Sequence, residues 1–241
     1  MTTPSEESAG HFVNNILPLY QGPSVKIRLQ PSNKEYVVSK PLLCAESSVF
    51  SKMFNREFLE SQQQTATLEE TEDDVSVRSL EALFQWLYRR TVEFEIEDPT
   101  NHIPAALELA RLADKYEITG LENTIAQCIE DIIISTPHPK NSATSSRRAF
   151  NTHTYYLRRD HIASASILHQ GHPVRTVLAA ASVEGFLRTE TPKFSEEIQA
   201  YPSFGADVLL EIRRTLHSGM TQTFTFEDPI SGKKLKALRE T

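Results

Sequence analysis

Residues 39–50 read Ser-Lys-Pro-Leu-Leu-Cys-Ala-Glu-Ser-Ser-Val-Phe and open a segment, 41–58, that is rich in Leu, Phe and Met. The segment predicts two short helices, because Pro41 suits a first helical turn, where its missing N–H would have no partner in any case. On its N-terminal side, residues 25–29 read Val-Lys-Ile-Arg-Leu, the apolar and charged alternation of a half-buried strand. We therefore expect a β-hairpin from 25–30 and 35–39, directly before the helices.

On the C-terminal side, residues 65–68, Thr-Ala-Thr-Leu, offer a third strand. An amphipathic helix should follow, with Asp74 as its N-cap, because apolar residues recur every three or four positions at Val77, Leu80, Leu83, Phe84, Leu87 and Tyr88. Trp86 falls opposite this stripe. Two interpretations stay open: other helices cover Trp86, or it is an exposed anchor of an interface.

Two further helices complete the first half of the chain. The first follows Pro104, runs to about Tyr116 and is apolar around most of its circumference, so it should be central and buried. After a break at Thr119-Gly120, the second should run from 121 to 134 and form a helix hairpin with it.

A Pro-, Asn-, Ser- and Thr-rich stretch from 137 to 148 predicts a linker, and helical spacing then returns at 160–168, 173–187 and 206–217. Residues 223–226 alternate like a weak strand. The expected organisation is an N-terminal segment (1–22), a first domain (23–136), a linker or surface loop (137–152), and a mostly α-helical C-terminal region with a short β-like tail (153–241).

Glycine and cysteine positions exclude several classes of protein. The eight glycines are never closer than Gly10 and Gly22, so no dinucleotide-binding fingerprint, phosphate-binding loop or nucleophile elbow can form. Two cysteines, Cys44 and Cys128, are too few for a disulfide framework or a zinc finger, and both fall on apolar helical faces. We expect no cofactor.

Charge argues against nucleic acid as a direct partner. Residues 1–139 carry 22 acidic and 11 basic side chains, a net charge of −11 that repels phosphates. The acidic runs 69–74 and 93–98 lack the alternating oxygen ligands of a calcium loop, and solvated turns explain them. No uncharged stretch fits a membrane span, and the acidic start of the chain is unlike a signal peptide, so we expect a cytoplasmic or nuclear protein.

Histidines are the remaining candidates for catalysis or metal binding. His169 and His172 are separated by two residues, but Gly171 and Pro173 place them in a turn without a further ligand nearby. His153 and His161 lie in a charged stretch that predicts a solvated helix start. No nucleophile, base and oxyanion donor can be assembled, so we expect no enzyme and no metal site.

The order of the predicted elements, together with four stretches of sequence, resembles a BTB/POZ domain. The four stretches are Val25-Lys-Ile-Arg-Leu29, Ser39 to Phe50, Phe84-Gln-Trp-Leu-Tyr88 and Leu112-Ala-Asp-Lys-Tyr-Glu-Ile118. The resemblance is closest to BTB proteins of filamentous fungi, whose C-terminal helical region has stretches similar to 173–178 and 201–209. It implies an α+β fold, a helical cluster capped by a short mixed sheet, followed by a mostly α-helical C-terminal region.

The resemblance also implies that the protein is non-catalytic, dimerises through its BTB domain and binds other proteins. The implied dimer interface comprises Phe12, Val13, Ile16, Leu17, Leu42, Leu43, Phe50 and Phe54. A first alternative is a substrate-recruiting adaptor of a cullin-3 ubiquitin ligase, with a partner surface at Phe54, Phe58, Pro104 and Leu107.

Departures from the family bear on both alternatives. Cullin-3 adaptors often carry an acid at the start of the helix after Pro104, where residues 105–107 are Ala-Ala-Leu. The second alternative, a transcription-associated regulator, relies in the family on an Asp and a His-Lys/Arg pair near the dimer interface. Here Ser24 and Ser39 replace the Asp and the His, and Lys40 remains.

Overall fold

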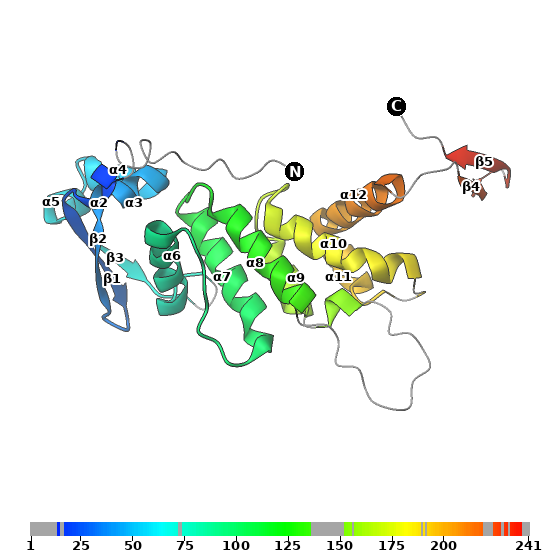
Figure 1. The fold of residues 1–241 in the computed structure, drawn as a ribbon, viewed down its shortest axis with the longest axis horizontal. Helices are drawn as coiled ribbons and strands as arrows, with labels where there is room; N and C mark the ends of the chain where they lie inside the picture. Colours follow the sequence, from blue (N-terminus) through cyan, green and yellow to red (C-terminus); the bar gives the residue numbers. More distant parts are fainter. Residues whose placement is uncertain are drawn as a thin grey trace. The chain divides into compact units, whose positions relative to one another are not determined.

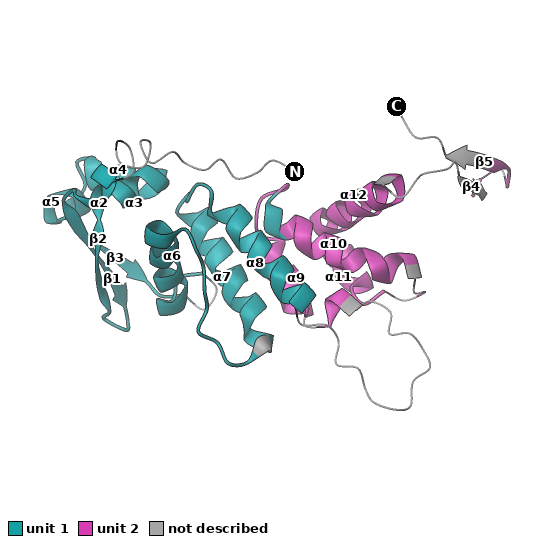
Figure 2. Ribbon diagram, viewed as in Figure 1, with its two compact units in different colours: residues 1–136, 172–174 teal, residues 137–171, 175–241 magenta. Residues whose placement is uncertain are grey.

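The computed structural model describes residues 14, 17–71, 74–135, 152–155, 157–188, 190, 192–218, 224–227, 229, 230 and 232–237. The chain forms two compact units, one made of residues 1–136 with 172–174 and the other of 137–171 with 175–241 (Figure 2). The α+β class predicted from the sequence is confirmed. Among the described helices, none is long and apolar enough to cross a membrane.

A three-stranded mixed sheet lies at one end of the first unit (Figure 1). Strand β1 (Ser24–Gln30) is central, antiparallel to β2 (Glu35–Ser39) and parallel to β3 (Thr65–Glu69). Every second residue of β1 is buried at Val25, Ile27 and Leu29, as its alternation predicts. The predicted hairpin and third strand are confirmed, and the parallel pairing of β3 with β1 makes the sheet mixed, as the family resemblance implied.

Four short helices flank the strands of this sheet in sequence: α2 (Leu17–Tyr20), α3 (Lys40–Glu46), α4 (Ser48–Asn55) and α5 (Leu59–Gln63). Helix α3 has Pro41 in its first turn, as expected, and the Ser39 hydroxyl caps it by accepting from the Leu42 N–H. Ser47 caps α4 in the same way, accepting from the Phe50 N–H at 3.0 Å.

Three longer helices follow in the first unit: α6 (Val77–Arg89), α7 (His102–Lys115), preceded by a 3-10 turn at Pro99–Asn101, and α8 (Leu121–Ser135). Helix α6 packs on α7, and α7 packs on α8 (Figure 1). Helix α7 is buried on nearly all sides, as predicted, and its buried residues are Ile103, Ala105, Ala106, Leu107, Glu108, Leu109, Ala110, Leu112 and Ala113. Gly120, at φ +84°, makes the left-handed turn between α7 and α8.

Two details of α6 settle questions raised by the sequence. Trp86 is only 4% exposed, so the interpretation in which other elements cover it is correct. The prediction of Asp74 as N-cap is wrong: Ser76 caps α6 by accepting from the Ser79 N–H at 3.1 Å, in a reciprocal capping box. Asp74 instead pairs with Lys115 of α7 at 3.2 Å.

The second unit is mostly helical. After a 3-10 turn (Thr152–Thr154) it comprises α9 (Arg159–Ala165), α10 (Pro173–Arg188), α11 (Ser195–Ala200), α12 (Pro202–Ser218) and a two-stranded ribbon of β4 (Phe224–Glu227) and β5 (Lys234–Ala237). The sequence did not predict α11 or β5. Helix α11 comes so close to α12 that a Cβ on Gly205 would lie 3.1 Å from the Ile198 carbonyl oxygen.

Candidate functional site

The structure joins two of the four sequence stretches, those containing Ser47 and Tyr116. The Phe50 ring stacks on the Tyr116 ring, with centroids 4.7 Å apart and planes 3° from parallel. Beside the stack, the Ser47 hydroxyl donates to the Tyr116 carbonyl, and the Thr119 N–H donates to the Glu46 carbonyl at 2.9 Å. These contacts tie the start of α4 to the end of α7, so both stretches serve the fold of the first unit.

Of the implied dimer residues that the structure describes, all but one lie in the core of a single copy. Phe12, Val13 and Ile16 fall outside the described residues, and Leu17 is half-buried in α2. The remaining four are at most 1% exposed: Leu42, Leu43, Phe50 and Phe54. A second copy would therefore contact other faces of α3 and α4, such as the neighbouring face of α4, where Val49 and Met53 are half-buried and one helical turn apart.

Only part of the implied partner surface is accessible in the structure. Phe54 and Leu107 are buried, at 1% and 2% exposure, and cannot reach another protein from this conformation. Phe58 is 50% exposed between α4 and α5, the next residue, Leu59, is 64% exposed, and Pro104 is half-buried in α7. Of the four residues, only Phe58 and Pro104 offer surface to a partner.

Lys40 has a structural role here. Its ammonium group donates to the Phe54 carbonyl at 2.9 Å, near the end of α4, where a cation is favourable. Ser39, which replaces the family's histidine, is bonded through its N–H to the Tyr88 hydroxyl oxygen at 2.8 Å and through its hydroxyl to the Leu19 carbonyl. These bonds engage both residues within the unit.

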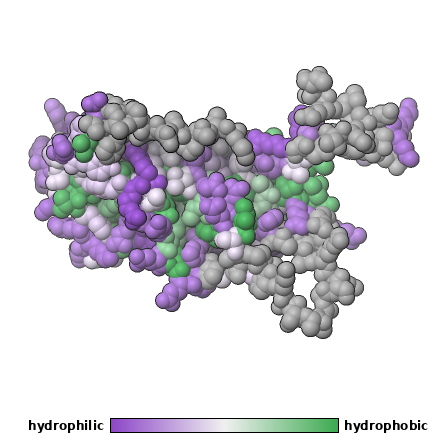
Figure 3. Space-filling model, viewed as in Figure 1, coloured by the Kyte–Doolittle hydropathy of each residue, from purple (hydrophilic) through white to green (hydrophobic). Residues whose placement is uncertain are grey.

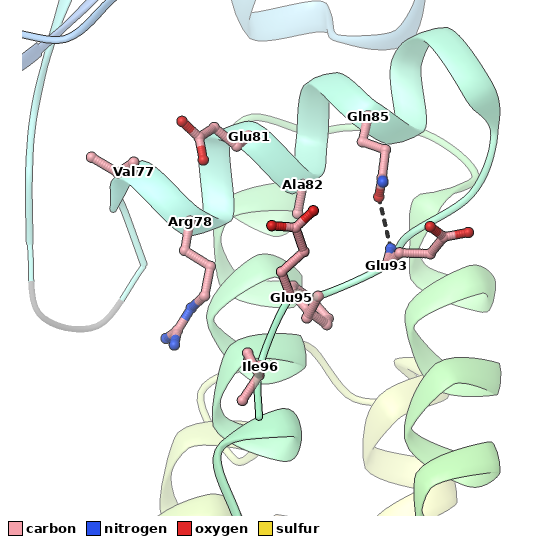
Figure 4. Close-up of a pocket in the computed structure, with 9 residues that line it drawn as sticks. Val77, Arg78, Glu81, Ala82, Gln85, Glu93, Glu95 and Ile96 are labelled. Atoms are coloured by element: carbon pink, nitrogen blue, oxygen red, sulfur yellow. Dashed lines mark hydrogen bonds between the residues drawn. The ribbon is translucent and has the colours of Figure 1, made fainter. Parts of the chain in front are cut away.

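A groove that the sequence did not indicate lies between α6 and the extended segment that follows it. Its volume is about 510 Å³, and its lining comprises Val77, Arg78, Glu81, Ala82, Gln85, Glu93, Phe94, Glu95 and Ile96. Figure 4 shows the segment running past α6, with the Glu95 side chain turned toward the helix beside Ala82. The Gln85 side-chain oxygen accepts from the Glu93 N–H at 2.7 Å and holds the segment in place.

Burial alternates along this extended segment. Val92, Phe94 and Ile96 are half-buried, while Glu93, Glu95 and Glu97 between them are exposed. This is the period of a strand, although the residues have no strand beside them in the described part of the chain. The prediction of a solvated turn at 93–98 was therefore incomplete, and the alternation itself was the signal available in the sequence.

The groove is acidic. Its one lining cation, Arg78, donates to the buried carboxylate of Glu108 in α7, with 3.1 Å between Nε and Oε2. Glu81 accepts from the Tyr36 hydroxyl at 2.8 Å, and burial, with this bond as the second cause, raises the pKa of Tyr36. For the carboxylates of Glu93 and Glu95 the described residues supply no ion pair, so their negative charges stay uncompensated.

In the second unit, His161 corrects the prediction of a solvated helix start. Its side chain is 2% exposed, its Nδ1 accepts from the Arg158 N–H at 3.2 Å, and its Nε2 is buried without a hydrogen-bond partner. Burial disfavours the charged imidazolium and lowers the pKa of His161 to about 4, while the neighbouring Asp160 opposes this shift.

We expect His161 to make the second unit less stable in mild acid. The imidazole of His161 takes up a proton near pH 6.5 in the unfolded chain and only near pH 4 in the folded chain. Protonation of His161 therefore does not affect the free energy of unfolding above pH 6.5, and it lowers this free energy increasingly as the pH falls from 6.5 to 4. From pH 7.5 to pH 5 the free energy of unfolding should fall by about 2 kcal/mol more in the parent than in His161→Gln. Urea unfolding at both pH values measures the difference; parallel losses in the two proteins would contradict it.

Of the other candidates for catalysis or metal binding, His172 and both cysteines are buried or half-buried in the fold. His172 is 3% exposed, and its Nδ1 accepts from the Val174 N–H at 3.1 Å at the start of α10. Cys44 and Cys128 are half-buried, and burial raises the pKa of both thiols, which disfavours the reactive thiolate. Among the described residues, no three His, Cys, Asp or Glu side chains are grouped to hold a metal ion.

A scan against protein families matches residues 22–133 to the BTB/POZ domain. A search of curated proteins finds no match to the chain. The matched range runs from the residues before β1 almost to the end of α8, so it contains the mixed sheet, the stacked Phe50 and Tyr116, and the acidic groove. BTB domains are, in general, protein–protein interaction modules. Residues 22–133 of this chain are therefore a BTB/POZ domain, and the region that follows them is mostly helical.

Proposed function

We propose that this chain is a non-catalytic protein–protein interaction protein that forms a homodimer through its BTB domain and uses the remaining surface to bind other proteins inside the cell. The family match to residues 22–133 carries the proposal. The exposed apolar residues Phe58 and Leu59, which follow α4, and the half-buried Val49 and Met53 of α4 add to it, because a second copy would remove such surface from water. The proposed interface also includes Phe12, Val13 and Ile16, which lie outside the described residues.

The homodimer is tested by sedimentation velocity at micromolar concentration, where we expect a dimer. Val49→Glu should raise the dimer dissociation constant at least about tenfold, because a carboxylate would lose water at the interface. Ile134→Glu is the control: Ile134 is 62% exposed on α8, on another part of the same unit, and its change should leave the dimer intact. Thermal melts check that both variants fold. A parent chain that sediments only as a monomer would refute the dimer.

A cullin-3 adaptor is the second candidate. The exposure of Phe58 favours it, because an aromatic side chain at the surface can anchor a partner. Against it, Leu107 is buried, and residues 105–107 lack the acid that cullin-3 adaptors often carry. The same sedimentation experiment with the amino-terminal domain of cullin-3 added decides between the candidates: a dimer that does not shift excludes the adaptor, and a shift that Phe58→Ala abolishes supports it.

A transcription-associated role is the third and weakest candidate. The charged pair on which that role relies in the family is absent, since Ser24 and Ser39 stand in the acidic and histidine positions. Lys40 is engaged with the Phe54 carbonyl. No described feature of the second unit adds to this candidate.

A further inference from the structure

The acidic groove between α6 and residues 93–96 combines an apolar floor with carboxylates at its rim. Half-buried Phe94 and Ile96 lie within it, and Val77 and Ala82 of α6 complete the apolar part of the lining. The rim bears Glu93 and Glu95. Figure 3 shows hydrophilic residues interspersed with small hydrophobic patches over the visible face. The mixture of apolar and acidic residues in the groove agrees with this pattern.

The two rim carboxylates have a fixed spacing. Backbone hydrogen bonds hold both positions: the Glu93 N–H donates to the Gln85 side-chain oxygen at 2.7 Å, and the Ile96 N–H donates to the Phe94 carbonyl at 2.9 Å, which closes a tight turn at Glu95. An extended chain lying along the groove would present every other side chain on one side, at intervals of about 7 Å. Alternate side chains of such a chain can reach two carboxylates that are two residues apart, whereas the side chains of a helix share a face only every three or four residues.

Charge then selects the composition of that segment. Arg78, the only lining cation, is engaged by Glu108, and between Glu57 and Asp98 the sequence carries 12 acidic side chains. An apolar occupant would strip water from Glu93 and Glu95 without compensation, which is costly. A second copy of the same groove would bring like charges together. Basic side chains on the occupant would avoid both penalties.

We propose that the acidic groove binds an extended segment of another protein in which Lys or Arg occupies alternate positions. The cationic side chains pair with Glu93 and Glu95, and an apolar side chain between them contacts Phe94 or Ile96. This inference deepens the proposed function, on which it rests, by naming the chemistry of one class of partner.

Fluorescence anisotropy with a labelled peptide, Lys-Ser-Lys-Val-Lys-Ser-Lys, tests the proposal on the full chain. We expect the parent to bind it, and the double variant Glu93→Gln, Glu95→Gln to bind at least about tenfold more weakly, because two charge pairs are lost. The matched control, Glu57→Gln with Glu69→Gln, removes two exposed carboxylates outside the groove lining and should change the affinity less than about twofold. A peptide of the same composition with its four lysines together should bind more weakly to the parent.

Three results would overturn the inference: no binding by the parent, equal weakening in both double variants, or equal binding of the two peptides. The last two would mean that the net charge of the chain, and not the groove, attracts the peptide. Sedimentation keeps this inference separate from the dimer. If the chain is a dimer that does not bind the peptide, only the proposal of a binding groove is refuted. If it is a monomer that binds the peptide through Glu93 and Glu95, only the proposal of a homodimer is refuted.

Discussion

Leu112→Asp should unfold the first unit or lower its free energy of unfolding by several kcal/mol, on the order of the whole stability of a typical domain. Leu112 is 0% exposed in α7, the helix that is buried on nearly all sides. The substitution removes a packed side chain and places a carboxylate in the buried interior, away from water. Chemical unfolding followed by circular dichroism measures the loss.

The matched control is Asp114→Ala in the same helix. Asp114 is exposed, and an acid near the C-terminal end of a helix is unfavourable, so the change should alter stability by less than about 0.5 kcal/mol. If Leu112→Asp unfolds at the same denaturant concentration as Asp114→Ala, Leu112 is at the surface and the described packing of α7 is incorrect.

The second large effect is expected for Asp207→Ala in the second unit. Arg175 is 3% exposed, its Nε and Nη2 lie 2.8 and 2.6 Å from the Asp207 Oδ2, and its Nη1 donates to the Leu168 carbonyl at 2.9 Å. Removing Asp207 leaves the guanidinium buried without its counterion, a change that costs about 3 to 5 kcal/mol. The measurement is the shift of the urea unfolding midpoint, read through the helices of the second unit.

An exposed pair in the same unit provides the comparison. Arg159 and Glu196 lie 2.7 Å apart, but their side chains are 66% and 73% exposed, so Glu196→Ala should cost less than about 1 kcal/mol. Restoring neutrality at the buried pair is the second check. Arg175→Met with Asp207→Leu should recover much of the stability that Asp207→Ala loses, since apolar residues can replace a buried ion pair. Equal effects of the two single changes would show that burial does not set the energy of these pairs.

The first unit follows closely from local patterns in the sequence. The alternation in β1 and the stripe on α6 each predict a buried face, because a period of two or of three to four residues reports such a face directly. The opposite face of α6 is also covered at Trp86, which the stripe alone does not indicate. The N-cap of α6 was misplaced because Asp74 and Ser76 are equally suitable in local sequence. Lys115, more than forty residues away, engages Asp74, and only the fold supplies that contact.

The second unit shows a similar limit. The charged neighbours of His161 predict a solvated position, yet the side chain is buried, because burial depends on elements distant in sequence. Helix α11 is only six residues long and begins with two acids after Ser195, too short for a helical period to be seen. Its Glu197 is 6% exposed and pairs with Arg159 at 3.1 Å, a contact that no periodicity indicates.

The candidate sites were the least predictable part. Apolar residues such as Leu42 and Phe54 have the same pattern in sequence whether they face the core or a second copy, and the structure places them in the core. The acidic groove was not predicted because the acids in its sequence indicate an exposed turn. Its acids look like a solvated turn until the half-buried Phe94 and Ile96 between and after them are seen in the lining of the groove.

The parallel pairing of β1 with β3 sets an order of events for a chain that emerges from the ribosome. The β2 edge of β1 can be satisfied as soon as residues 35–39 are out, since only a short turn separates the two strands. The other edge has to wait for residues 65–69, which pair with Lys26 to Gln30 across the intervening helices. Until then the nascent protein exposes a strand with Val25, Ile27 and Leu29 on one side and unpaired backbone groups at its edge, a template for association with other chains.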